Sequence, residues 1–305
     1  MMKKVISSIA LASIATPLMA ADIDEANLNF YGSLRLMLER AESTDDTQYK
    51  DALSRVGLTA EYDLGEGLSA FTKYELGLNL ADDADGDSIS NLRHGHIGLK
   101  NEDFGAVSFG KVWSPFYEAI GFISDYMWWN SAPVYYTLDG GLHVAETVHY
   151  ASPDMSGLKF RAMLQVDDGD ETNKEQSQYS ATYSLGNVTL AGAYTAAADD
   201  NNQAGFAIAY SGDGFYTNAG YIDKENVGAG VDALVGVPLG KHLVTLGVSD
   251  FSSDEEDKDF TAGILAYQYK LHSKVLLWAE LMAWEGTLYG VEESNQTNIG
   301  INFNF

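Results

Sequence analysis

Six histidines are the side chains of this 305-residue chain best suited to acid–base, nucleophilic or metal chemistry. None of them belongs to a Gly-x-Ser-x-Gly or His-Glu-x-x-His motif, the patterns that place a nucleophilic serine or a catalytic metal. We therefore expect no enzymatic activity, no cofactor and no metal site. The histidines are His94, His96, His143, His149, His242 and His272.

Two arginines could instead act through their fixed charge. Arg35 and Arg55 lie in segments where apolar and polar residues alternate, and each shares a face with polar neighbours. Successive side chains of a β-strand point to opposite faces. If the apolar faces meet lipid, both arginines point inward, because an arginine facing mid-membrane lipid costs about 2–4 kcal/mol. The same parity places Lys73 and Arg161 inward, where ordinary solvated wall positions are an equally good interpretation.

Alternating segments of about ten residues recur along the chain and are joined by short turns and longer polar loops in turn. The short turns are rich in Gly, Asn, Asp and Pro, which tight hairpins require. Seven such turns imply eight loops on the opposite side and sixteen strands, the even number of a bacterial outer-membrane barrel. We therefore expect an all-β, 16-stranded antiparallel transmembrane β-barrel. The expected turns cover residues 63–67, 101–105, 152–157, 186–187, 212–214, 238–241 and 271–273.

The N-terminus and the composition fit an exported barrel. Residues 1–20 combine two lysines, an apolar run and small residues at the expected cleavage site, which is typical of a secretory signal peptide. Residues 21–305 would form the barrel. No later apolar run reaches the 18 residues of a membrane-spanning helix. The formal net charge of −26 argues against nucleic-acid binding, which needs clustered Lys and Arg. The chain has no cysteine, so no disulfide stabilises it even though exported proteins meet an oxidising compartment.

The last eight residues form the clearest two-faced segment. Ile299, Ile301, Phe303 and Phe305 share one side, whereas asparagines and a glycine occupy the other. This pattern predicts a closing strand with an outer face in lipid and asparagines facing the lumen. We expect the polar face to meet the first strand near its inward residues, Asn27 and Asn29.

The third long connection, residues 113–143, is far longer than its neighbours and rich in aromatic side chains. Loops of this length without regular structure are usually functional or disordered, and this composition is not that of disorder. We expect the loop to fold into the barrel and narrow it, since sixteen strands enclose an aqueous channel. Its aromatics could anchor the loop to the wall, which we favour, or present a stacking surface for sugars. The aromatics concerned are Trp113, Tyr126, Trp128 and Trp129.

Five motifs in this order resemble the general diffusion porins of Gram-negative outer membranes, in the branch common in Vibrio-like and other marine gammaproteobacteria. No single motif is specific, but together they cover nearly the whole mature chain. They are Asn27 to Gly32, Arg93 to Lys100, Phe104 to Lys111, Tyr150 to Leu158 and the terminal Phe305.

The resemblance implies an inward third loop whose carboxylates oppose a ladder of basic residues on the wall. Arg35, Arg55 and Arg93 fall on ladder positions, and His149 stands where the family often has another arginine. A Pro-Glu-Phe-Gly-Gly-like loop motif is absent, so the acid that faces the ladder is left open. Alternatively, the arginines only pair with lumen acids to fill the interior. The candidate loop acids are Glu118, Asp125 and Asp139, and Lys73 and Arg161 would extend the ladder.

The expected function is passive diffusion of ions and small hydrophilic solutes across the outer membrane, with a cation preference that follows from the net acidity. The resemblance also implies a homotrimer in lipid and lipopolysaccharide, and an assembly machinery that reads Phe305. A substrate-specific oligosaccharide porin is the main alternative, and a surface adhesin or phage receptor is a non-channel one. The acidic run Asp83 to Asp87 is best interpreted as solvated surface, although weak divalent bridging to lipopolysaccharide is conceivable.

Overall fold

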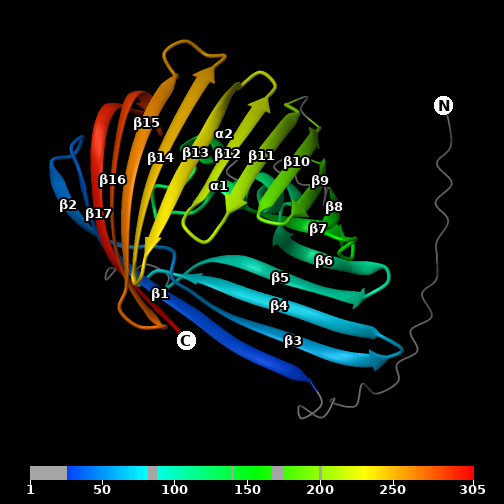
Figure 1. Ribbon diagram of the computed structural model, residues 1–305. Coiled ribbons are helices and arrows are strands. Elements are labelled where there is room, and N and C mark those ends of the chain that lie inside the picture. The colour runs from blue at the N-terminus through cyan, green and yellow to red at the C-terminus, as the bar shows by residue number, and fades with distance from the viewer. Residues whose placement is uncertain (1–25, 82–87, 139–140, 167–174, 199–200) are drawn as a thin grey trace.

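The structure, a computed structural model, describes residues 26–81, 88–138, 141–166, 175–198 and 201–305. The strands in these ranges form one antiparallel sheet that closes on itself, because β1 pairs with β17 on one side and with β3 on the other (Figure 1). The expected signal peptide lies outside the described residues. The described helices are short, and none is long and apolar enough to cross a membrane.

The secondary structure follows the chain in the order of the sequence, with the helical turns between the sixth and seventh strands. The elements are β1 (Asn27–Ala41), β2 (Asp46–Asp51), β3 (Arg55–Gly65), β4 (Leu68–Leu78), β5 (Ile89–Asn101), β6 (Gly105–Trp113), η2 (Tyr117–Gly121), α1 (Phe122–Ser124), α2 (Pro133–Leu138), β7 (His143–Ala151), β8 (Leu158–Gln165), β9 (Gln176–Leu185), β10 (Val188–Ala197), β11 (Gln203–Ser211), β12 (Tyr216–Lys224), β13 (Gly228–Leu239), β14 (His242–Ser253), β15 (Phe260–Lys270), β16 (Val275–Leu288) and β17 (Val291–Asn304).

The sixteen-stranded prediction is confirmed, although seventeen strands are present, because the second barrel strand is interrupted. β1 pairs with β2 over Leu36–Ala41 and with β3 over Asn27–Ser33. Between β2 and β3 the backbone leaves the sheet at Leu53, whose φ of 68° is left-handed. Ser54 bridges the gap, since its hydroxyl accepts a hydrogen bond of 2.8 Å from the Arg35 amide. β2 and β3 are therefore two pieces of one strand.

All seven expected short turns join consecutive strands in the structure. The connections on the opposite side are more uneven than the sequence suggested. β12 and β13 are joined by only Glu225–Val227, and β16 and β17 by Tyr289 and Gly290. Asn226, Tyr289 and Gly290 have positive φ, which lets the chain reverse within two or three residues. The eight opposite connections are thus not all long.

The outer face of the barrel is apolar, as alternation predicts. Along β15, residues alternate between buried and exposed, with Leu265 and Tyr267 on the outer side and Ala262, Ile264 and Ala266 on the inner side. Exposed aromatic and aliphatic side chains of this kind occur around the sheet, where lipid rather than water would cover them.

The inner face differs between the two halves of the barrel, whereas regular alternation of apolar and polar residues would give every strand a polar inner face. Strands β10 to β16 carry apolar inward residues that pack against the inward-folded segment 114–138, so protein rather than water covers them. The inward wall residues that form ion pairs, such as Glu39, Glu75 and Arg161, lie on β1 to β8, whereas β13 and β16 each contribute a buried carboxylate, Asp232 and Glu280. From the segment, the core includes Phe116, Ala119, Ile120, Val134, Tyr135 and Leu138, and from the wall Ala207, Ile222, Leu234, Ile264, Met282 and Trp284.

The closing seam joins the first and last strands in a different register from the one expected. Ser33 lies opposite Asn304, and Arg35 lies opposite Asn302, whose side chain is fully buried. The Ser33 hydroxyl donates a 2.8 Å hydrogen bond to Asn302. Asn27 and Asn29, the partners that the sequence suggested, pair instead with β3. Asparagine does line the inner side of the seam, but its neighbours are Ser33 and Arg35.

Candidate functional site: a channel beside the inward-folded segment

A cavity of 1090 Å³ separates the inward-folded segment 114–138 from the wall. Basic, acidic and aromatic side chains line it together. The lining includes Arg35, Glu39, Lys50, Arg55, Arg93, Lys111, Trp113, Phe122, Asp125, Tyr126, Trp128 and His143. This combination gives the cavity a strong local field, because charges across a narrow space act on one another at short range.

Two buried carboxylates of the wall fix the segment in place. Glu280 on β16 is 2% exposed and accepts hydrogen bonds from the backbone amides of Trp128, Trp129 and Asn130 at 2.6, 3.2 and 2.8 Å. Since buried charges must be compensated, these amide dipoles take the place of a cation. Nothing in the sequence singles out Glu280, because its partners are about 150 positions away.

Asp232 on β13 holds the other end of the segment. Its carboxylate accepts hydrogen bonds from the amides of Val134 and Tyr135 at 3.1 and 3.0 Å, at the start of α2. The Ser249 hydroxyl donates a further bond of 2.6 Å from the neighbouring strand. A negative charge at a helix N-terminus is favourable, although this helix is short. Asp232 and Glu280 are thus positioning residues that the sequence analysis missed.

The predicted basic positions of the first strands meet on one side of the cavity. The Arg35 guanidinium lies 4.6 Å from the ring centroid of Trp128, an arrangement that holds the charge against the segment. Arg93 Nε is 2.7 Å from Glu75 Oε1, and Arg55 Nη1 is 4.0 Å from the same oxygen. Glu75 on β4 therefore balances part of the ladder, as expected if the arginines pair with lumen acids.

A β-bulge explains why Arg93 and its neighbour both point inward. The partner of Glu75 is His94, whereas the partner of Leu76 is Leu92, so Arg93 is an extra residue in β5. A bulge places two residues opposite one and re-aims a side chain. Strict alternation would have sent either Arg93 or His94 to the lipid side, and both are instead buried.

The last basic positions contact the segment directly. Arg161 Nε on β8 lies 3.1 Å from Glu118 Oε2, and His149 Nε2 on β7 lies 3.7 Å from that oxygen. Burial raises the pKa of the Glu118 carboxyl, and the charge of Arg161 acts in the opposite direction. The structure thus brings Glu118 against the wall, on the side where the resemblance placed the ladder.

Asp125 lies at the cavity but is held by the segment itself. Its Oδ2 accepts hydrogen bonds from Tyr117 and Tyr136 at 2.7 and 3.1 Å. Burial raises the pKa of both phenols, so they stay protonated and can donate. Asp139, the third candidate acid, lies outside the described residues, as do residues 83–87 of the acidic run.

The remaining predicted residues occupy several environments. Trp128 and Trp129 pack against a small cluster of Met37, Ala52 and Trp278. Tyr126 packs against Tyr216, with ring centroids 4.2 Å apart and ring planes tilted by 32°. These contacts are those of anchors, but Tyr126 is still 45% exposed.

Lys73 and Trp113 lie together beside the ladder. Lys73 Nζ sits 4.9 Å from the ring centroid of Trp113 and 3.9 Å from Glu75 Oε2. This lysine is therefore part of the charged cluster, and its surroundings differ from those of an ordinary solvated wall residue.

At the end of the chain, the Phe305 ring covers Gly32 of β1. A Cβ on Gly32 would lie 2.2 Å from the ring, so a larger residue there would displace the phenyl group. Backbone hydrogen bonds of 3.1 Å run in both directions between these two residues. The terminal residue thus packs against the first strand and is hydrogen-bonded to it.

A closed sixteen-stranded barrel with an inward third connection and a charged cavity beside it defines a porin-type outer-membrane barrel. A model of the Gram-negative porin family matches residues 7–286, and this chain belongs to that family. It is 28% identical over 179 residues to the major outer membrane protein of Pasteurella multocida and spans about half of that relative, 49% of its length.

Solved porin structures share the fold. OmpT of Vibrio cholerae, in its trimer form, gives a TM-score of 0.76 at 19% identity, covering 92% of this chain and 100% of OmpT. An anion-selective porin from Comamonas acidovorans gives a TM-score of 0.75 at 15% identity, covering 92% of this chain and 100% of that porin. Together these findings place the chain in the outer membrane of a Gram-negative bacterium.

Proposed function

We propose that the barrel is a water-filled channel through which ions and small hydrophilic solutes cross the outer membrane by passive diffusion. The observation that carries the proposal is the 1090 Å³ cavity between the segment 114–138 and the wall, whose lining includes five basic and two acidic side chains. Ordered water in such a lining favours polar solutes over bulky apolar ones. Family membership also favours a channel over an enzyme.

Swelling of liposomes that contain the purified protein tests this function. In isotonic sugar solutions the liposomes should swell, and the rate should fall as the sugar becomes larger. Absence of swelling with the smallest sugars would contradict a channel and would favour an adhesin or receptor role.

The proposed ion preference is weakly cationic, because two sets of charges oppose each other. The whole chain carries a net charge of −26, which enriches cations at the channel mouths. Among the described residues that line the cavity, five basic side chains face two acidic ones, which favours anions locally. Part of this basic charge is paired, as Lys50 is with Glu39 and Arg93 with Glu75. At low salt, we expect the attraction of cations by the net negative charge to outweigh the local excess of basic side chains.

A substrate-specific oligosaccharide porin is a second candidate, because aromatic rings reach the cavity. Phe122 is 57% exposed and Tyr126 is 45% exposed, so the anchoring role does not use their whole surface. Such rings can stack on the apolar faces of sugars. Oligosaccharides at micromolar concentration should then block single-channel current, and unaffected current would exclude this candidate.

Self-association as a homotrimer in lipid and lipopolysaccharide is the proposed assembly. It is supported by the trimer form of OmpT, a neighbour in fold, and by the wide apolar outer face of the barrel. Light scattering of the detergent-purified protein should give three times the mass of the chain. A monomeric mass under conditions that keep the barrel folded would contradict it.

Phe305 is the proposed signal for the outer-membrane assembly machinery. Its ring is 49% exposed and lies against Gly32 of the first strand, at the end of the closing strand. Deletion of Phe305 should lower the amount of assembled protein without changing the conductance of the assembled molecules. Unchanged assembly would contradict this role.

A further inference from the structure

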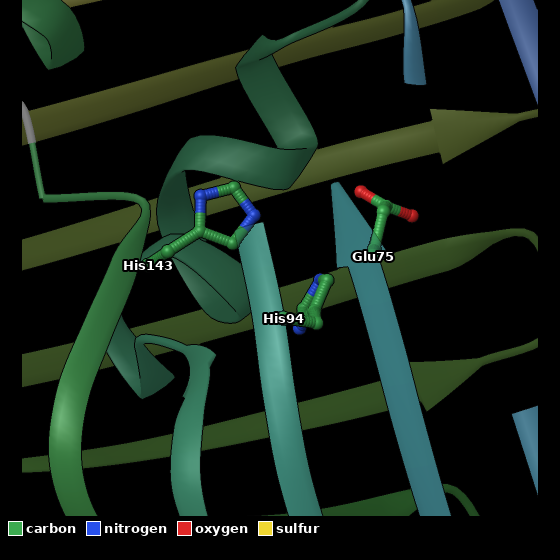
Figure 2. Close-up of side chains that lie close together, drawn as sticks. All are labelled: Glu75, His94 and His143. Carbon is green, nitrogen blue, oxygen red and sulfur yellow. The ribbon is translucent and has the colours of Figure 1, made fainter. Parts of the chain in front are cut away.

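Three side chains from three strands converge at the edge of the channel in an arrangement that the proposed transport does not require. Ligand atoms of Glu75 on β4, His94 on β5 and His143 on β7 all lie within 4.8 Å of one another. Figure 2 shows the two imidazole rings and the carboxylate turned toward a common space. We propose that these three residues bind a divalent transition-metal ion of the Zn²⁺, Cu²⁺ or Ni²⁺ class.

His94 is the observation that points to a ligand. Its side chain is 2% exposed, and among the described residues neither ring nitrogen has a hydrogen-bond partner. A neutral imidazole carries one N–H and one lone pair, and leaving either unsatisfied in the interior costs free energy. The ring is held edge-on by His143 and Trp113, with centroid distances of 4.8 and 5.0 Å. A metal bound to His94 would use its buried lone pair.

The other two ligands are already oriented by hydrogen bonds. Trp113 Nε1 donates to His143 Nε2 over 3.0 Å, so this nitrogen carries the lone pair of the ring, and a bound metal would replace the Trp113 N–H as its partner. Tyr31 and Arg93 each donate a 2.7 Å bond to a different oxygen of Glu75. Each carboxylate oxygen has two lone pairs, so one remains for a metal while the donors fix the group.

Ligand type and geometry select the class of ion. Two imidazoles and a carboxylate suit Zn²⁺, Cu²⁺ and Ni²⁺, whereas Ca²⁺ and Mg²⁺ prefer all-oxygen sites. Metal–ligand bonds of about 2.0–2.2 Å require the three groups to close inward by roughly 1 Å, which side-chain rotation can provide. His143 lines the channel cavity, so the remaining coordination position faces water and the ion can enter from the channel.

Neighbouring cations set the strength of the site. Lys73 Nζ and Arg55 Nη1 lie 3.9 and 4.0 Å from the Glu75 oxygens. These like charges repel a divalent ion, so we expect weaker binding than in closed four-ligand sites. The same repulsion gives a test in which a substitution should strengthen binding.

Titration of the detergent-purified full-length protein with Co²⁺ and Zn²⁺ tests the proposal. Co²⁺ should give visible absorption with one ion per chain, which Zn²⁺ displaces, and calorimetry should give the Zn²⁺ affinity. His94→Gln and His143→Gln should each weaken Zn²⁺ binding at least ~10-fold, the scale seen for disturbed metal sites. His272→Gln, in an exposed turn, should bind like the unmodified protein.

Lys73→Gln distinguishes a site from general damage, because it should tighten Zn²⁺ binding at least ~3-fold by removing a like charge. A misfolded variant would not gain affinity. Absence of Co²⁺ absorption, or unchanged affinity in both histidine variants, would overturn the proposal and place any bound ion elsewhere, such as on the acidic loops. These measurements do not depend on transport, so failure of the metal site leaves the channel proposal intact.

Discussion

Arg161 on β8 and Glu118 in the inward-folded segment form an ion pair with an Nε–Oε2 distance of 3.1 Å. The pair crosses from the barrel wall to the segment, on the side of the barrel where the other ion-paired wall residues lie on β1 to β7. It therefore joins the two parts of the molecule that enclose the channel, opposite the carboxylate anchors Asp232 and Glu280.

Removal of the Glu118 charge should shift ion preference toward anions. Glu118→Gln keeps the size of the side chain but leaves Arg161 without its partner, so the local field becomes more positive. The permeability ratio of K⁺ to Cl⁻, from reversal potentials, should fall. Glu66→Gln, in the exposed turn between β3 and β4, is the matched control and should leave the ratio nearly unchanged. An equal effect of both substitutions would contradict a special role for Glu118.

As the pH falls, the channel should lose its cation preference. The loss should begin at a higher pH than the protonation of a glutamate with an ordinary pKa would give. Burial raises the pKa of Glu118 above its usual value, so this carboxyl takes up a proton early as the pH falls. Protonation removes a negative charge beside Arg161, His149 and Lys73, and preference then moves toward anions. The reversal potential should be followed from pH 7 to pH 4. The early part of the change should be absent from Glu118→Gln, and identical profiles would contradict this assignment.

Loss of the Glu280 carboxylate should loosen the segment. Glu280→Gln replaces one acceptor oxygen by an amide group that cannot accept from the amides of Trp128 to Asn130. An orphaned buried donor costs about 1–3 kcal/mol. We expect a lower thermal midpoint and noisier single-channel current. Glu285→Gln, an exposed position on the same strand, should change neither, and equal current noise in both variants would contradict the anchoring role.

A larger residue at Gly32 should disturb assembly through Phe305. Gly32→Val would displace the Phe305 ring from β1, since even a Cβ at this position would lie 2.2 Å from the ring. The yield of folded protein in the outer membrane should drop. Gly263→Val on β15 is the control, because its Cβ meets open space. Similar yields for both variants would show that the seated position of Phe305 is unimportant.

The sequence was sufficient for the features that depend on alternation. Arg35 and Arg55 point inward because the opposite parity would place charge in lipid, and the hairpin turns follow from Gly, Asn, Asp and Pro. The interruption at Leu53 and the bulge at Arg93 were not predicted, since one irregular residue leaves the surrounding apolar pattern intact.

Contacts between distant parts of the chain could not be predicted from the sequence either. Glu280 and Asp232 resemble any inward acid until the segment that they hold is folded against them. Likewise, Glu75, His94 and His143 are spread over about seventy positions and match no metal-binding motif, so their convergence appears only in the barrel. The apolar inner wall of β10 to β16 has the same origin, because the segment replaces water there.

The central claim, a charged aqueous channel with a weak cation preference, is tested most directly by the reversal potential across a planar bilayer in a KCl gradient. The acidic net charge acts at long range, and its effect extends only about 10 Å at 0.1 M salt. We predict a reversal potential of the sign for K⁺ preference that grows as both KCl solutions are diluted at a constant ratio. A reversal potential of the sign for Cl⁻ preference, or no ion current at all, would contradict the account.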